Sequence, residues 1–258
     1  MQQEADNPWV RRFTPCPPSA LRLICFPHVG GAASAYVALS RALAPHVEVL
    51  ALQYPGRQDR RHEPHPGSVP ALADGVAGAL RPTLDGRPYA FFGHSMGALL
   101  AFETARLMTA TGASGPVRLF ASARRAPSVP RTEAVHLRDD AGLLTEIRRL
   151  SGTDQQVLED EELLALALPA IRADYRAVET YRYLPGAPLD CPVTVFAGDR
   201  DTETDAPDLV AEWAGLTTAD TDLRVFSGGH FYLDGRAEEA AAEITARLRT
   251  ATADRSSV

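Results

Sequence analysis

Residues 89–111, YAFFGHSMGALLAFETARLMTAT, decide the fold. The apolar run at 89–92 has the composition of a buried strand, and residues 98–108 have the apolar spacing of a helix. Between them, residues 93–97 form a G-x-S-x-G sequence. That short pattern occurs by chance, but a strand directly before it and a helix directly after it are the context in which the serine is a nucleophile on a sharp turn. We therefore predict that Ser95 is a nucleophile at the end of a strand.

The same alternation of strand and helix extends along the chain in both directions. Apolar runs of strand length lie at 21–26, 47–52, 89–93, 117–122, 193–198 and 223–228, and amphipathic segments lie near 34–44, 69–80, 96–111, 204–216 and 235–252. Strands that are apolar on both faces and separated by helices are typical of a parallel sheet covered on both sides. With the serine turn, the pattern predicts an α/β-hydrolase fold with a mostly parallel central sheet flanked by helices.

One interval is too long for a single crossover. Residues 124–190 open with the proline-containing stretch RRAPSVPR and continue with a helical pattern, in which Asp139 and Asp140 are candidate caps. A helical insertion above the strand ends would cover the crevice where ligands bind, so a lid is one interpretation. A second helical layer with no gating role is the alternative. We expect one domain over 1–258, with a flexible polar tail at 251–258.

Composition excludes several classes of protein. The 258 residues suffice for one well-buried core, and no apolar run approaches the ~20 residues of a membrane span. A net charge of −7 argues against nucleic-acid binding, which depends on phosphate neutralisation by Lys and Arg. The first residues lack the pattern of a signal peptide, and three scattered cysteines show no metal-binding spacing. We expect a cytoplasmic protein with no metal and no nucleic-acid or membrane partner.

A serine hydroxyl needs a histidine base and a third group that orients the histidine. In this fold the partners follow in the order Ser, Asp or Glu, His, each after a strand. His230 lies in a Gly-Gly-His turn after the run at 223–228, so it is the predicted base. Asp201 and Asp199 both follow the run at 193–198. Position favours Asp201 as the acid, and Asp199 is the alternative, with a hydrogen bond inside its turn as its other role.

The other histidines have no such pattern. His94 neighbours the nucleophile, but its side chain is expected to point away from the serine, in a packing role. We expect the remaining candidates to be surface residues, namely His46, His62, His65 and His136.

An acyl-transfer site also needs two backbone N–H groups that stabilise an oxyanion. The first comes from the residue after the nucleophile, Met96. The second comes from the loop after an early strand, and the glycine-rich loop at 26–31 makes Val29 the candidate. Taken alone, that segment is also compatible with an ordinary tight turn.

Arginines occur in local clusters, namely Arg57, Arg60 and Arg61, then Arg124, Arg125 and Arg131, then Arg148 and Arg149. Clusters of this kind are usually solvated surface. The alternative is a docking patch for an acidic partner.

Several motifs together resemble a known family. They are CFPHVGG at 25–31, QYPGRQDRR at 53–61, FGHSMGA at 92–98, FAGDRD at 196–201 and GGHF at 228–231. This combination is similar to the stand-alone type II thioesterases of polyketide and nonribosomal peptide synthesis. Residues 172–183, RADYRAVETYRY, match the lid region of that family.

The resemblance implies an editing enzyme that hydrolyses unwanted acyl groups from the phosphopantetheine arm of acyl or peptidyl carrier proteins, without a cofactor of its own. It implies the Ser95, His230 and Asp201 triad with Met96 and Val29 as oxyanion donors. The family more often has alanine where this chain has Val29, which bears on chamber size more than on catalysis. Carrier proteins are generally acidic, so Arg124 and Arg125 become candidate docking residues. The rival functions are a general carboxylesterase and a non-catalytic carrier-binding module.

Overall fold

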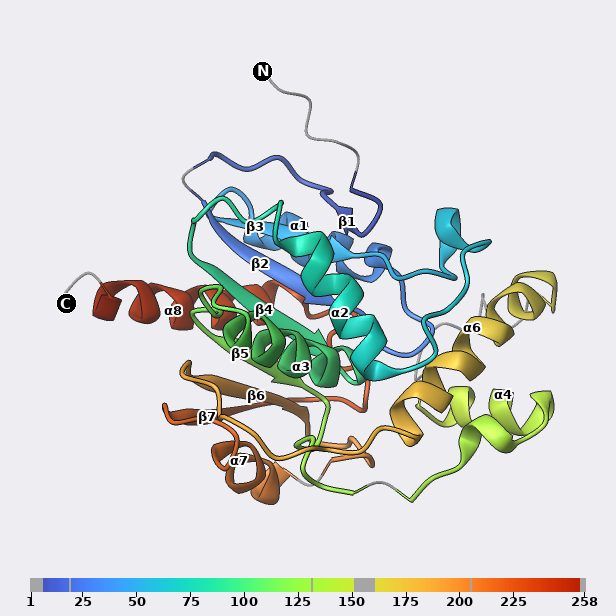
Figure 1. Cartoon of the computed structure of the whole chain (residues 1–258). Coiled ribbons are helices and arrows are strands. Elements are labelled where there is room, and N and C mark those ends of the chain that lie inside the picture. The colour runs from blue at the N-terminus through green and yellow to red at the C-terminus, as the bar shows by residue number, and fades with distance from the viewer. Residues whose placement is uncertain (1–6, 19, 131, 151–160, 205, 256–258) are drawn as a thin grey trace.

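The strands form one seven-stranded sheet with the order β1-β3-β2-β4-β5-β6-β7 (Figure 1). The computed structural model describes residues 7–255 apart from 19, 131, 151–160 and 205. The strands are β1 (Val10–Arg11), β2 (Leu21–Phe26), β3 (Val47–Leu52), β4 (Tyr89–His94), β5 (Leu119–Ser122), β6 (Val193–Gly198) and β7 (Thr221–Phe226). All neighbours pair in parallel except β1, which is antiparallel to β3. The mostly parallel sheet is confirmed, and β1 is too short to leave a pattern in the sequence.

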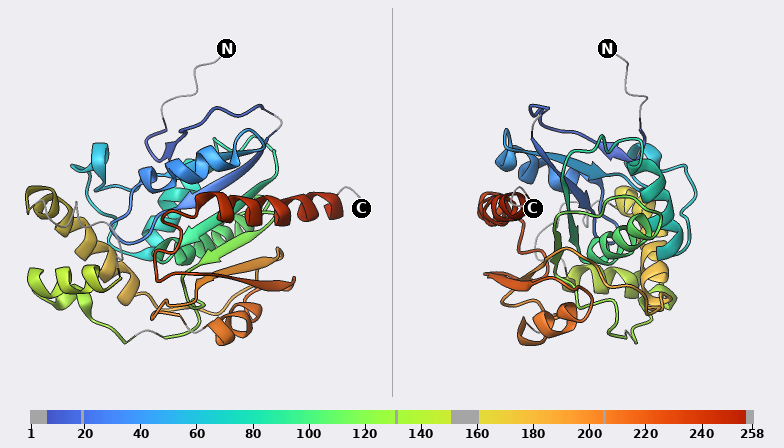
Figure 2. Two further views of the ribbon diagram at one scale, coloured as in Figure 1. Left: turned by 180° about the vertical axis from the view of Figure 1, so that it is seen from behind. Right: turned by 60° about the vertical axis from the view of Figure 1, so that its left-hand side comes forward.

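Helices cover both faces of the sheet. They are η1 (Ala33–Tyr36), α1 (Val37–Leu43), η2 (Gln58–Arg60), α2 (Val69–Leu80), α3 (Met96–Ala110), η3 (Val135–Leu137), α4 (Asp140–Leu150), α6 (Glu161–Glu179), α7 (Ala206–Ala214) and α8 (Ala237–Arg255). Helices α1 and α8 lie together on one face, and α2 and α3 on the other (Figure 2). Successive residues of a strand point to opposite faces, so Phe91 packs in the α2–α3 core and Phe92 in the α1–α8 core.

The long insertion between β5 and β6 contains η3, α4 and α6, which lie beyond one end of the sheet (Figure 1). Helix α4 begins after Asp139, whose Oδ1 accepts the N–H of Gly142 at 2.8 Å, so the expected cap is present. A small apolar cluster that includes Leu143 of α4 and Ile171 of α6 packs the two helices together, and Val29 lies against it. The insertion therefore contacts the loop that follows β2.

The C-terminal end differs from the expectation of a flexible tail at 251–258. Helix α8 continues to Arg255, because the alanine-rich pattern of the preceding turns runs on through residues 251–255. Residues 256–258 lie outside the described part of the chain. In the described part, none of the helices combines the length and the apolar character needed to cross a bilayer.

Candidate active site

The turn between β4 and α3 holds Ser95 in a strained conformation, with φ 55° and ψ −116°. Backbone strain of this kind clusters at functional sites. A Cβ atom on Gly93 would overlap the backbone of Gly97, and one on Gly97 would overlap the carbonyl oxygen of Phe26. Both glycines are therefore required by close backbone approach, and the start of α3 lies directly against the end of β2.

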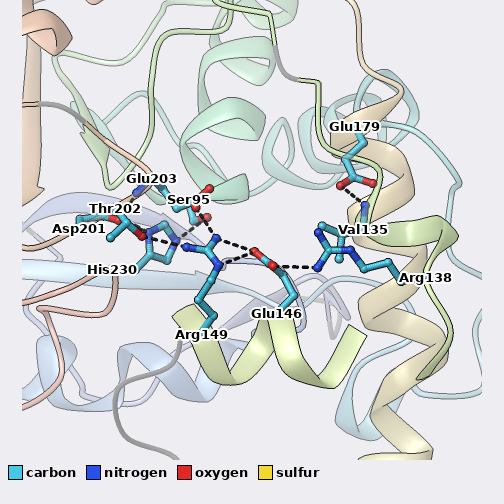
Figure 3. Close-up of polar contacts among 10 residues, drawn as sticks. All are labelled: Ser95, Val135, Arg138, Glu146, Arg149, Glu179, Asp201, Thr202, Glu203 and His230. Carbon is cyan, nitrogen blue, oxygen red and sulfur yellow. Dashed lines mark hydrogen bonds and ion pairs between the residues drawn. The ribbon is translucent and has the colours of Figure 1, made fainter. Parts of the chain in front are cut away.

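Ser95 is the first member of a hydrogen-bonded chain of three side chains (Figure 3). Ser95 Oγ lies 3.0 Å from His230 Nε2, and His230 Nδ1 lies 3.0 and 3.1 Å from the two carboxylate oxygens of Asp201. Both the histidine and the aspartate are buried. A carboxylate can only accept, so Nδ1 carries the proton and leaves Nε2 free to accept from the serine hydroxyl. The structure thus brings together the three residues that the sequence analysis grouped.

The two candidate acids lie in different surroundings. Asp201 Oδ1 also accepts the N–H of Glu203 at 2.9 Å. Burial acts to raise the pKa of Asp201, but the hydrogen bond and charge of His230, together with the N–H of Glu203, outweigh it and hold that pKa below its usual value. Asp199 instead accepts the N–H of Gly228 at 2.8 Å, and its side chain is half exposed. Of the two, it is Asp201 that contacts the histidine, and Asp199 bonds inside the turn.

Two backbone segments converge on the serine. Val29 lies in the loop after β2, which neighbours β4 in the sheet, and no hydrogen bond joins its N–H to another described residue. Met96 is the first residue of α3, and a helix leaves its first N–H groups without an intrahelical acceptor. The positive end of the helix dipole adds to the potential there. Both N–H groups therefore lack an acceptor among the described residues, which is compatible with the predicted donor role, and that role stays a prediction.

His94 and His28 pack beside the catalytic pair. The ring of His94 lies 5.4 Å from that of His230, and its Nδ1 is 2.8 Å from Ser122 Oγ. Burial and the nearby charge of His230 lower the pKa of His94 well below its usual value, and the same two causes lower that of His28 to about 4. Both rings are neutral near pH 7. His94 therefore has the expected packing role and makes no contact with the serine hydroxyl.

Two of the four expected surface histidines, His65 and His136, are partly buried and paired with buried carboxylates. His46 and His62 are exposed, as expected. His65, however, bonds to the buried Asp174, and His136 bonds to the buried Glu179. Sequence reasoning missed both because each partner lies on α6, far along the chain.

The expectation of solvated arginine clusters is also wrong at three positions. Arg57, Arg60 and Arg124 are each no more than 6% exposed, so their guanidinium groups are structural. Arg125 is partly exposed but forms an ion pair with Glu212. Because Arg124 is buried, it cannot form an exposed docking patch. Charge along the sequence carried no signal of this burial.

A further arginine connects the insertion to the acid loop (Figure 3). Arg149, at the end of α4, donates to Thr202 Oγ1 at 2.9 Å and pairs with Glu203, the two residues that follow Asp201. Glu146 of the same helix also pairs with Arg149. The sequence contains no signal of this contact, because a basic residue in the last turn of a helix is common.

Comparisons with known proteins agree with this geometry. Residues 21–248 match the family described as a thioesterase domain. The chain is 50% identical to thioesterase PikA5 of Streptomyces venezuelae over 93% of this chain and 85% of that protein.

Solved structures show the same likeness. The type II thioesterase BorB from the borrelidin biosynthetic cluster superposes with a TM-score of 0.87 at 47% identity, covering 93% of this chain and 98% of BorB. YbtT, a type II thioesterase from the yersiniabactin NRPS/PKS pathway, gives 0.82 at 29% identity, covering 94% and 99%. The resemblance seen in the motifs is confirmed. The chain belongs to the thioesterase family, within the α/β-hydrolase fold, and is a hydrolase that acts on thioesters.

Proposed function

We propose that this enzyme is an editing type II thioesterase, which hydrolyses stalled or aberrant acyl groups from the phosphopantetheine arm of carrier proteins in polyketide or nonribosomal peptide synthesis. The observation that carries the proposal is the bonded chain Ser95–His230–Asp201 in a protein so similar to type II thioesterases. A non-catalytic binding module would have no need of that chain, nor of the strained serine turn.

The first half of the reaction forms an acyl-enzyme. Ser95 Oγ attacks the thioester carbonyl carbon as His230 Nε2 takes the hydroxyl proton, and Asp201 stabilises the resulting imidazolium. The carbonyl oxygen becomes an oxyanion that the N–H groups of Met96 and Val29 receive. The C–S bond then breaks, and His230 returns its proton to the departing thiolate of the phosphopantetheine arm.

The second half releases the acyl group. Water gives a proton to His230 Nε2 and attacks the ester carbonyl, and the same N–H groups hold the second oxyanion. When this second tetrahedral intermediate collapses, His230 returns the proton to Ser95 Oγ and a carboxylic acid is released. Apart from substrate and water, each step uses groups of the chain alone, so we propose no cofactor. The three cysteines are free thiols, which fits the reducing cytoplasm that we propose as the compartment.

The test compares two acyl donors of the same acyl group. Release of acetyl or propionyl from a carrier protein's phosphopantetheine arm is measured beside hydrolysis of the matching nitrophenyl ester, with Ser95→Ala as the control. Serine-dependent release that favours the carrier substrate is expected. Cleavage of the small ester alone would instead indicate a general carboxylesterase, and no serine-dependent turnover of either would refute the proposed mechanism.

A further inference from the structure

Helix α6 of the insertion places a fully buried carboxylate against the loop that carries Val29. Asp174 is 0% exposed, and its Oδ2 accepts the N–H of Gly30, the next residue after Val29, at 2.7 Å. The same oxygen forms an ion pair with the buried Arg57, and Oδ1 lies 2.9 Å from His65 Nε2. Three segments distant in sequence therefore meet at this one side chain.

The hydrogen bonds define the charge on each partner. His65 Nδ1 accepts the N–H of Gly67 at 2.9 Å, so it is Nε2 that carries the proton donated to Asp174. Burial acts to raise the pKa of Asp174, but Arg57, His65 and the Gly30 N–H together hold that pKa below its usual value. The carboxylate is therefore ionised near neutral pH.

The contacts close a ring around the loop. Arg57 Nε donates to the carbonyl oxygen of Gly31 at 3.2 Å, while Arg57 also pairs with Asp174. The N–H of Gly30 and the C=O of Gly31 are thus both held by one ion pair. Gly30 has φ +71°, and a Cβ atom there would lie 2.7 Å from Ile171 Cγ1, one turn before Asp174 on α6. One face of α6 therefore fixes both the position and the orientation of this backbone.

Stability alone gives a weak reason for this arrangement. A buried ion pair is often no more stabilising than apolar residues of the same volume. A fixed backbone donor beside the nucleophile is, by contrast, of direct use, because an oxyanion hole works by holding its donors in place before charge develops. A displacement of about 1 Å in such a site can cost about 10²-fold in rate.

We propose that Asp174 is a positioning residue of the oxyanion hole. With Arg57, it holds the Val29–Gly31 backbone in its catalytic geometry, and so makes helix α6 of the insertion part of the catalytic apparatus. The inference rests on the proposed function of Val29 as a donor and goes beyond it, because Asp174 itself touches neither the triad nor the reacting atoms.

The same helix supplies a matched control. Glu179 is also buried and accepts the N–H of Val135 at 2.8 Å (Figure 3). It also accepts the N–H of His136 at 3.0 Å and pairs with the ring of His136. Its partners are in η3, and Val135 belongs to the apolar cluster against which Val29 packs, but no hydrogen bond joins Glu179 to the described residues of the serine turn or of the loop at 29–31. Glu179→Gln therefore replaces a buried carboxylate on α6 and leaves the polar contacts of the loop with Asp174 and Arg57 in place.

The experiment measures kcat and KM for a nitrophenyl ester in Asp174→Asn and Glu179→Gln. It also measures affinity for a trifluoromethyl ketone, which adds to Ser95 and places an oxyanion in the hole, and for a thioether analogue that lacks the carbonyl. For Asp174→Asn we expect kcat to fall at least tenfold, towards the ~10²–10³-fold loss of a missing donor. The affinity for the ketone should fall by the same factor, whereas KM and the affinity for the thioether should stay unchanged. Glu179→Gln should change none of these.

A second variant separates positioning from folding. Asp174→Leu with Arg57→Met removes both charges, so no unpaired ion remains buried, and the variant should fold. Its kcat should still fall at least tenfold. Normal kcat in either folded variant, or equal losses in Asp174→Asn and Glu179→Gln, would overturn the inference. Absence of serine-dependent turnover in the unsubstituted enzyme would instead refute the proposed function, so the two failures are distinguishable.

Discussion

Replacement by asparagine, made separately at Asp201 and at Asp199, distinguishes the two candidate acids. In Asp201→Asn the side-chain oxygen is needed at the Oδ1 position, because the N–H of Glu203 donates there at 2.9 Å. The amide NH₂ then takes the place of Oδ2, which lies 3.0 Å from His230 Nδ1. Two donors would face one another, which favours the tautomer with its proton on Nε2. In that tautomer, His230 cannot accept the proton of Ser95.

The expected loss follows from that geometry. Full inversion of the tautomer costs about 10⁴-fold in kcat. The remaining oxygen is 3.1 Å from Nδ1 and retains part of the correct hydrogen bond, so the loss lies between about 10² and 10⁴-fold. Asp199→Asn keeps an oxygen for the Gly228 N–H at a half-exposed site, so its kcat should stay within about twofold.

The assay is the steady-state hydrolysis of a nitrophenyl ester by both variants, with circular dichroism as the check on folding. Subtraction of the Ser95→Ala rate isolates the serine-dependent part. A larger loss in Asp199→Asn than in Asp201→Asn would refute the assignment of the acid. Equal losses would show that the histidine is oriented by something other than the Asp201 carboxylate.

Three further predictions concern stability and the insertion. Gly97→Ala would place a Cβ atom on the Phe26 carbonyl, and should lower the free energy of unfolding by about 1–3 kcal/mol; an unchanged denaturation midpoint would contradict this. Arg149→Ala removes two partly exposed ion pairs, with Glu203 and Glu146, each worth at most about 1 kcal/mol, so Tm should fall only slightly. Limited proteolysis near α4 should nevertheless be faster in this variant than in the unsubstituted enzyme. Equal cleavage rates in the two proteins would show that Arg149 does not hold α4 against the loop after Asp201. The lowered pKa of Asp201 stabilises the fold above the unfolded value near 3.8, and that contribution disappears as pH falls through the lower folded value. Any stability deficit of Asp201→Asn at pH 7 should therefore narrow below pH 4 in urea denaturation, and a constant deficit would disprove the linkage.

Local chemistry explains why so much of the site could be predicted. The G-x-S-x-G turn can be recognised from near neighbours, since Gly93 and Gly97 are four residues apart and a side chain on Gly93 would collide with the backbone of Gly97. The collision of a side chain on Gly97 with Phe26 is, by contrast, a tertiary contact. Parallel strands bring their carboxyl ends to one edge, so residues that follow β4, β6 and β7 meet without further information. For that reason, Ser95, Asp201 and His230 could be grouped by their places after strands.

The burial of the arginines and the contacts of α6 could not be predicted in this way. Arg57 belongs to a cluster that resembles solvated surface, and Asp174 to a helix that resembles an ordinary amphipathic one. The sequence contained one hint, an aspartate in the mostly apolar stretch that precedes Tyr175. It could not name the partners of that aspartate, because the side chain is buried only when α6 lies over the loop after β2.

The sequence by itself therefore determined the fold class and the family, and it identified Ser95 and His230 as the proposed nucleophile and base. Those features depend on hydrophobic period, on tight turns and on the order of elements, all of which are local. Only the tertiary structure decided that Asp201 rather than Asp199 contacts His230, that Arg124 is buried, and that Asp174 holds the oxyanion loop. The contacts of Asp174 join residues between 109 and 144 positions apart. Burial and pairing over such separations come from the packing of whole elements, which no short window of sequence contains.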